Sequence, residues 1–271
     1  MVKKLLVFFV FISVIYADLL HDKIKELCDS KNYQIHQNLI NLIFKDKSRF
    51  YINSERLNYQ AIIEELKKNS LLSTKFVATQ QFTITFKSNS NALFFLKTIS
   101  SILNSVGYNQ FITQNASYLN NQFACSVSLE NDSIIDPEIL LNEFDKRGCI
   151  VNNINKYSPT HWEYSVDSTN LKLAEAQFIN IKEQLSLSKP ISDYWIEIKA
   201  GTKLEIIPNI SDSWFPMVTC YDKSLQIVKI EKIEEKTKKM VVELPFGTKY
   251  IKISDIYSLN NIKRGLTIKL Y

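Results

Sequence analysis

Apolar residues recur at two different spacings along the chain, and the change from one to the other divides it into parts. Over residues 18–72 they lie three or four positions apart, as in DLLHDKIKELCDS and LNYQAIIEELKKNSLL. That spacing gathers the apolar side chains on one side of an α-helix. We therefore expect a helical N-terminal segment over residues 18–72.

Residues 73–168 alternate between strand and helix patterns. KFVATQQFTITFKS alternates apolar and polar positions, which predicts a strand, and the amphipathic stretch that follows it ends at Gly107. Two further strand patterns, a helix with Asp136 as cap and Pro137 at its first position, and a last pair of strands follow. The order β-α-β-β-α-β, with one extra strand, predicts a ferredoxin-like (split β-α-β) α+β domain.

The next stretch, TNLKLAEAQFINIKEQLSLSKP, has a helical spacing. Leu173, Ala176, Phe178 and Ile181 fall near one side of a helical projection, and Pro190 ends the stretch. We expect residues 169–190 to form a helix that links two domains.

Residues 191–271 contain many short alternating strands separated by turns, a density typical of an antiparallel β-sandwich. The succession IKAGTKLEII, MVTCYDKSLQIV and VELPFGTKYIKISD resembles the pattern of bacterial pre-peptidase C-terminal domains. It departs from that pattern at Thr202 and Lys203, where an acid is common after the glycine. The resemblance implies an accessory domain of the kind found beside enzymes, with a binding or packing role, and it implies no catalysis in this chain.

The first 17 residues, MVKKLLVFFVFISVIYA, have the basic start, apolar core and small residues of a cleavable signal peptide. Its apolar core is too short for a stable membrane anchor, and no later run approaches the ~20 apolar residues of a membrane helix. We expect an exported, periplasmic protein with no membrane span after cleavage at Ala17.

Charge and motif content exclude several functions. The formal net charge is +5, and removal of Lys3 and Lys4 would lower it further, which does not favour a nucleic-acid partner. The sequence contains no phosphate-binding glycine loop, no H-E-x-x-H zinc motif and no G-x-S-x-G hydrolase motif. We expect no cofactor and no catalytic residues, although distant carboxylates brought together by the fold would leave no trace in the spacing.

The most suggestive polar set lies in SPTHWEYSVD. Alternation places His161, Glu163, Ser165 and Asp167 on one side of a strand and Trp162, Tyr164 and Val166 on the other. Ser165 is four positions from His161, about 13 Å away, so the two cannot form a direct catalytic pair. Two hypotheses remain: the polar set is the solvent face of a strand, or His161 and Glu163 bind a metal with an acid from elsewhere.

Aromatic residues are frequent in the last part of the chain. Trp214, Tyr221 and Tyr257 are candidate ligand-binding residues, since exposed aromatic rings on a sandwich can stack on sugars. The alternative is that they belong to the core. SWFP, with Trp214 before Pro216, is the best candidate for an exposed platform.

Four cysteines, at positions 28, 125, 149 and 220, would be exposed to an oxidising compartment after export. Their spacing fits no zinc motif. Cys125 and Cys149 are the candidate disulfide pair, if both lie near one sheet; otherwise each is a buried free thiol.

Together these features predict a non-catalytic interaction or scaffolding protein of the cell envelope, with envelope proteins as partners. One alternative is a glycan- or peptidoglycan-binding accessory protein. A second alternative is an envelope hydrolase with a site around His161.

Overall fold

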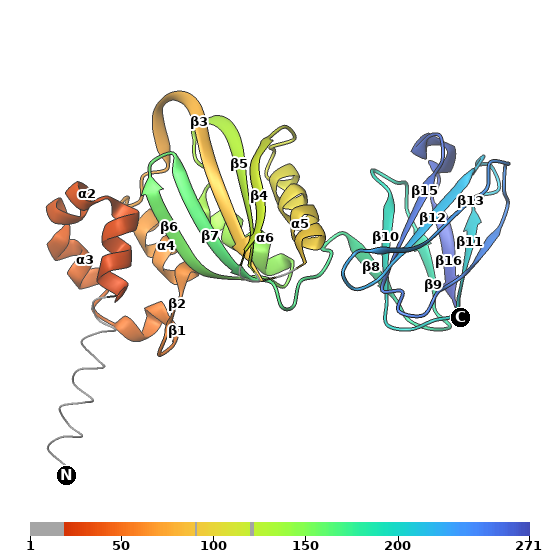
Figure 1. The fold of residues 1–271 in the computed structure, drawn as a ribbon, viewed down its shortest axis with the longest axis horizontal. Helices are drawn as coiled ribbons and strands as arrows, with labels where there is room; N and C mark the ends of the chain where they lie inside the picture. The colour runs from red at the N-terminus through yellow and green to blue at the C-terminus, as the bar shows by residue number, and fades with distance from the viewer. Residues whose placement is uncertain (1–18, 90, 120–121) are drawn as a thin grey trace, which may run out of the picture. The chain divides into compact units, whose positions relative to one another are not determined.

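The structure is a computed structural model that describes residues 19–89, 91–119 and 122–271. Helices and several sheets are both present, which confirms the α+β class. The chain divides into two compact units, Met1–Lys172 and Leu173–Tyr271 (Figure 1). The predicted signal peptide lies outside the described residues.

The N-terminal helices belong to the first unit and share its core. Residues 19–28 are helical, followed by α2 (Ser30–Ile35), α3 (Gln37–Ile43), η1 (Lys47–Phe50), the short pair β1 (Tyr51–Asn53) and β2 (Arg56–Leu57), and α4 (Tyr59–Lys68). Apolar residues such as Leu20, Ile24 and Ile62 form one buried cluster with residues of the sheet that follows. The helical character of the segment is confirmed, but it is packed as part of the larger unit.

The first unit is built on a five-stranded sheet. Its elements are β3 (Lys75–Ser88), α5 (Ala92–Ser105), β4 (Ile112–Leu119), β5 (Gln122–Ser133), α6 (Pro137–Lys146), β6 (Ile150–Ser158) and β7 (His161–Asp167). The strand order is β4-β5-β3-β7-β6. β3 and β7 run parallel, and the other neighbours are antiparallel.

Both sheet-covering helices begin with a side-chain cap, and the sequence predicts the one at Asp136. The Asn91 side chain accepts hydrogen bonds from the backbone of Leu93 and Phe94 at the start of α5. Asp136 accepts from the backbone N–H of Glu138, with Pro137 at the first position of α6. These side chains satisfy backbone donors that have no partner within the helix.

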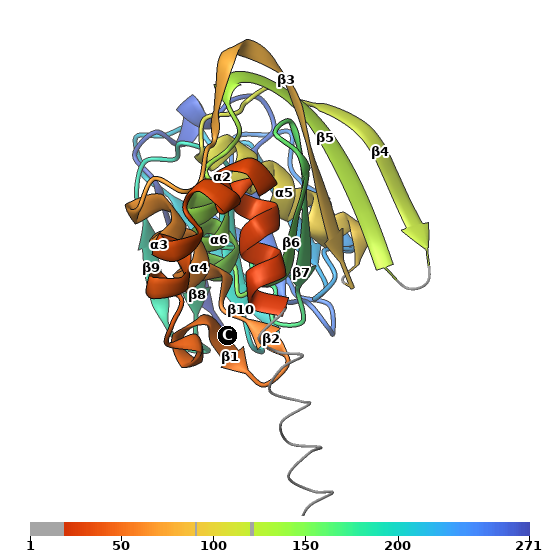
Figure 2. The same cartoon turned by 90° about the vertical axis from the view of Figure 1, so that its left-hand side faces the viewer.

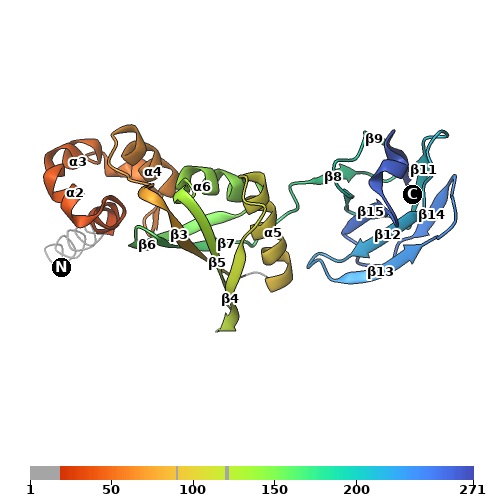
Figure 3. The same cartoon turned by 90° about the horizontal axis from the view of Figure 1, so that it is seen from above.

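The two faces of this sheet differ in chemistry. One face carries Phe82, Ile84 and Phe86 of β3 and packs with the helices in the buried cluster. Helices α5 and α6 lie on this same side of the sheet (Figure 3). The alternate residues of β3, among them Thr83 and Thr85, therefore point to the opposite, open face.

The second unit contains two sheets around a separate core. Its elements are β8 (Ala176–Ile179), β9 (Gln184–Leu187), β10 (Tyr194–Ile198), β11 (Lys203–Pro208), β12 (Pro216–Tyr221), β13 (Ile227–Lys232), β14 (Met240–Glu243), β15 (Tyr250–Asp255), η2 (Leu259–Ile262) and β16 (Leu266–Leu270). The strand orders are β13-β12-β15-β10-β8 and β14-β11-β16-β9. Buried residues of both sheets, including Ile196, Val218, Ile206 and Ile268, form one cluster.

The predicted linking helix over residues 169–190 is wrong. β8 pairs with β10 and β9 pairs with β16, so this stretch supplies an edge strand to each sheet of the second unit. Lys182, between them, has a φ of 66°, a left-handed conformation that a continuous helix would not contain. The helical spacing of the apolar residues is overridden because two sheet edges offer hydrogen-bond partners to an extended chain.

Candidate functional site

The stretch that contains His161 forms β7, and its alternation is confirmed. Trp162, Tyr164 and Val166 are buried in the core, and His161 and Glu163 lie on the open face. β7 pairs in parallel with β3, which places His161 opposite Thr83 and Glu163 opposite Thr85. The polar set is thus the open face of a central strand of the sheet.

Glu163 is already engaged by neighbouring side chains. Its Oε2 lies 2.8 Å from Lys87 Nζ, and its Oε1 accepts a hydrogen bond of 3.2 Å from Asn155 Nδ2. Among the described residues, no group of three or more His, Cys, Asp and Glu side chains is placed to hold a metal ion. The predicted metal site at His161 and Glu163 therefore lacks its third ligand, and a lysine occupies the place beside the carboxylate.

His161 faces neutral neighbours. Its Nε2 lies 3.4 Å from Thr85 Oγ1, and its ring centroid lies 5.1 Å from that of Tyr157. Asp167, the other acid of the strand, instead accepts hydrogen bonds from the backbone and hydroxyl of Thr169. A triad needs an acid that orients the histidine, and the contacts of His161 provide none.

A shallow cavity of about 430 Å³ lies on this open face between β3, β4, β5 and β7. Hydroxyl and amide side chains dominate its lining, and His161 is its one titratable residue. The lining residues are Gln81, Phe82, Thr83, Thr85, Gln114, Asn115, Ser126, Ser128, Thr160 and His161. We call this set the polar trough.

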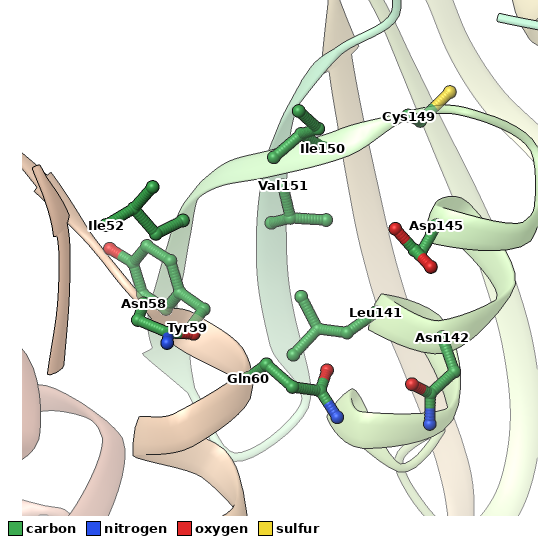
Figure 4. A pocket seen from close by; sticks show the side chains of 10 residues that line it. All are labelled: Ile52, Asn58, Tyr59, Gln60, Leu141, Asn142, Asp145, Cys149, Ile150 and Val151. Atoms are coloured by element: carbon green, nitrogen blue, oxygen red, sulfur yellow. The ribbon is translucent and has the colours of Figure 1, made fainter. Parts of the chain in front are cut away.

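A second cavity, of about 360 Å³, lies between α4, α6 and β6 (Figure 4). It is lined by Ile52, Asn58, Tyr59, Gln60, Leu141, Asn142, Asp145, Cys149, Ile150 and Val151. Burial raises the pKa of the Cys149 thiol to about 12, and Figure 4 shows its sulfur directed away from the other labelled side chains. A neutral thiol is a poor nucleophile, so this cavity offers no evident chemistry.

The predicted aromatic platform of the second unit does not form. Trp214 is fully buried, and its Nε1 donates a hydrogen bond of 3.0 Å to the carbonyl oxygen of Ser254. Burial is favoured because the indole contributes a large apolar area and its one polar group finds a partner. Trp214 is therefore a core residue, as the alternative hypothesis stated.

The other two candidate aromatics are far from each other. Tyr221 lies against Trp195, with ring centroids 5.2 Å apart, and Tyr257 lies edge-on to Phe215 at 5.1 Å. Phe215 precedes Pro216 at the start of β12, and Tyr221 is the last residue of that strand. Phe215 and Tyr221 are six positions apart in the sequence, roughly 20 Å along an extended strand, so Tyr221 and Tyr257 do not form one stacking surface.

The candidate disulfide is not formed. All four cysteines are free and buried. Cys125 lies on β5 and Cys149 directly precedes β6, with β3 and β7 between those strands. Three inter-strand spacings amount to roughly 14 Å, well beyond the Cα separation of a disulfide.

One surface was not anticipated from the sequence. All eight residues of β4 are exposed, and β4 is the edge of its sheet. Together with β5 it projects from the helical part of the first unit (Figure 2). The sequence does carry one signal that could have revealed this surface, an absence of charge: residues 98–129 contain no Lys, Arg, His, Asp or Glu.

Comparisons with known proteins do not assign this chain. No family model and no curated protein matches it. A solved structure, described as a Glycosylation Associate Protein (Gap123) complex from Streptococcus agalactiae, has 12% sequence identity and a TM-score of 0.19. The match covers 32% of this chain and 31% of that chain, and at this TM-score it supports no conclusion.

Within the described ranges, no helix combines the length and apolar composition needed to cross a bilayer.

Proposed function

We propose that this chain is an exported, periplasmic interaction or scaffolding protein of the cell envelope, without catalytic activity. The predicted signal peptide supports export, and the engaged side chains around His161 favour a non-catalytic role. The observation that carries the proposal is β4, an exposed edge strand in an uncharged stretch of chain.

We further propose that the first unit is a variant of the ferredoxin-like plan. The elements β3-α5-β4-β5-α6 follow its order, and a single closing strand beside β3 would complete it. Here β6 is antiparallel to β7, and β7 is parallel to β3, so β6 has the direction expected of that closing strand. β7 turns back and inserts between β6 and β3, which is the extra strand of the sequence pattern.

For the second unit we propose an accessory β-sandwich that resembles pre-peptidase C-terminal domains. Two sheets around one core support this proposal. Its edge strand β13 carries Lys229, Glu231 and Lys232 among exposed apolar residues. Charged residues on an edge strand oppose pairing with another chain, so the edge strand β13 is protected where β4 is not.

Strand β4 has little of the protection usual for an edge strand: among its described residues the irregularity is a register shift against β5 between Thr113 and Asn115. An edge strand presents unpaired backbone N–H and C=O groups, and proteins normally protect it with charge, proline or a covering element. ITQNASYL contains no charged residue and no proline, and Ile112, Tyr118 and Leu119 expose apolar side chains. An extended segment of a partner protein can add to such an edge, with backbone hydrogen bonds giving affinity and side-chain contacts giving specificity.

Crosslinking in cells of the organism that encodes the chain tests this proposal. A photoreactive phenylalanine derivative replaces Tyr118, and adducts are identified by mass spectrometry. We expect a discrete adduct that the double variant Ala116→Lys, Ser117→Lys abolishes, because two ammonium groups on the edge oppose strand addition.

The matched control places the same charges on β13, an edge strand of the second unit, as Ile227→Lys with Val228→Lys. Both residues are exposed on β13, so we expect this variant to retain the adduct. Equal adduct yields from both double variants would contradict the role of β4.

A further inference from the structure

The floor of the polar trough is an array of hydroxyl groups. Thr83 lies opposite Ser128 and Thr85 opposite Ser126 across the antiparallel pair β3–β5. Directly opposed residues are about 5 Å apart, and alternate residues on one strand are about 7 Å apart. Four hydroxyls thus occupy the corners of a small rectangle on the open face of the sheet.

These hydroxyls are only partly satisfied by one another. Thr85 Oγ1 lies 2.9 Å from Ser126 Oγ and 3.4 Å from His161 Nε2, and Thr83 Oγ1 donates to Gln114 Oε1 at 3.4 Å. A hydroxyl has one donor and two acceptor sites, and an amide has two of each. The array therefore keeps donors and acceptors of both kinds for a bound molecule.

An aromatic ring borders the trough. The Tyr157 side chain is 59% exposed, and it contacts the ring of His161, which lines the cavity. β6 and β7 are paired, with Ser158 opposite His161, so Tyr157 belongs to the neighbouring strand. An exposed phenol ring offers an apolar face with a polar tip.

Charge is absent from the lining. None of its ten residues is Asp, Glu, Lys or Arg, and the adjacent Lys87 and Glu163 neutralise each other. A phosphate or carboxylate ligand would call for Arg, Lys or a backbone anion site. An uncharged ligand rich in hydroxyl and amide groups is the chemical match for this surface.

We propose that the polar trough is a binding site for a neutral oligosaccharide, with Tyr157 stacking on a sugar ring and Thr85, Ser126 and Gln114 bonding its hydroxyls. A protein partner is less suited, because polar side chains make up most of the lining where an apolar anchor would bind, and an extended peptide would find its backbone partners at the β4 edge instead. This site does not depend on the proposed interaction role of β4.

Titration of the isotope-labelled protein with N-acetylglucosamine tetrasaccharide, cellotetraose and maltotetraose tests the proposal. Amide chemical shifts are followed by NMR, and we expect at least one of the three to bind with a Kd of about millimolar, as for a shallow site. The largest shifts should fall on β3, β5 and β7. Tyr157→Ala and Thr85→Val, which removes only the hydroxyl, should each weaken binding by about tenfold.

The matched control is Tyr257→Ala, which removes a tyrosine that is 65% exposed in the second unit and should leave binding unchanged. The double variant Ala116→Lys, Ser117→Lys should also retain it, which separates this site from the proposed partner contact. The proposal is overturned if none of the three sugars shifts the trough resonances up to tens of millimolar. It is equally overturned if binding survives both trough variants, or if a neutral peptide displaces the sugar from the same residues with higher affinity.

Discussion

Lys87 Nζ lies 2.8 Å from Glu163 Oε2 on the open face of the first unit. The two residues stand on neighbouring parallel strands, and the Glu163 side chain is only 9% exposed. The pair explains why a carboxylate that looks like a metal ligand in the sequence is tolerated at a nearly buried position. It also predicts what happens when the lysine is removed.

We expect Lys87→Met to destabilise the first unit by about 1–2 kcal/mol, because it leaves a largely buried carboxylate with Asn155 as its remaining partner. Adding Glu163→Gln should recover most of the loss. Urea unfolding followed by the amide NMR signals of β3 and β7 measures the first unit. Arg49→Met is the control: its ion pair with Glu65 leaves the Arg49 side chain 60% exposed, so we expect a loss below about 0.5 kcal/mol.

Glu143 on α6 should make stability depend on pH. Burial alone would raise its pKa, but hydrogen bonds from Lys146, Arg147 and Ser105 lower it to about 2. A folded-state pKa below the unfolded value of about 4.3 means that the carboxylate stabilises the fold above that pH. This contribution is lost as pH falls toward 2.

The free-energy difference between wild type and Glu143→Gln should therefore shrink as pH is lowered from about 5 to 2. Because solvent screens these charges in part, we expect the pH-dependent part of this difference in unfolding free energy to be about 1–2 kcal/mol. Urea unfolding at several pH values measures it. A difference that stays constant across this range would show that the charge of Glu143 does not contribute.

Trp214 should contribute to the stability of the second unit. Trp214→Phe removes the donor of the 3.0 Å hydrogen bond to Ser254 and leaves a cavity in the core, so we expect a loss of about 2–3 kcal/mol. Tyr257→Ala, at an exposed position, should cost less than about 0.5 kcal/mol. Thermal unfolding by circular dichroism checks both, and similar effects of the two substitutions would contradict the burial of Trp214.

The four cysteines should behave as buried thiols. Burial raises the pKa of Cys28 and of Cys149 to about 12, and thiolate is the reactive species. We expect a thiol reagent at pH 8 to modify the native protein slowly and the urea-unfolded protein completely. Addition of a reducing agent should leave the unfolding midpoint unchanged, whereas a lower midpoint would reveal a disulfide.

Local patterns predicted most strands and helices because each is encoded within a few residues. The alternation in β7 identified Trp162, Tyr164 and Val166 as core residues, and Asp136 with Pro137 marked the start of α6. The same local logic failed at residues 169–190, where the helical spacing was overruled by two sheet edges distant in sequence. Aromatic residues near a proline were equally ambiguous, because Trp214 is buried in a core built from strands on both sides of it in the sequence.

The sequence by itself determined the α+β class, the order of strands and helices in the first unit and which face of β7 is buried. These properties depend on the period of apolar residues and on helix caps, which act over short stretches of chain. Only the tertiary structure decided that Lys87 lies beside Glu163, that two strands lie between those of Cys125 and Cys149, and that β4 is an exposed edge. Strand order and register bring together residues far apart in the chain, and no local spacing records them.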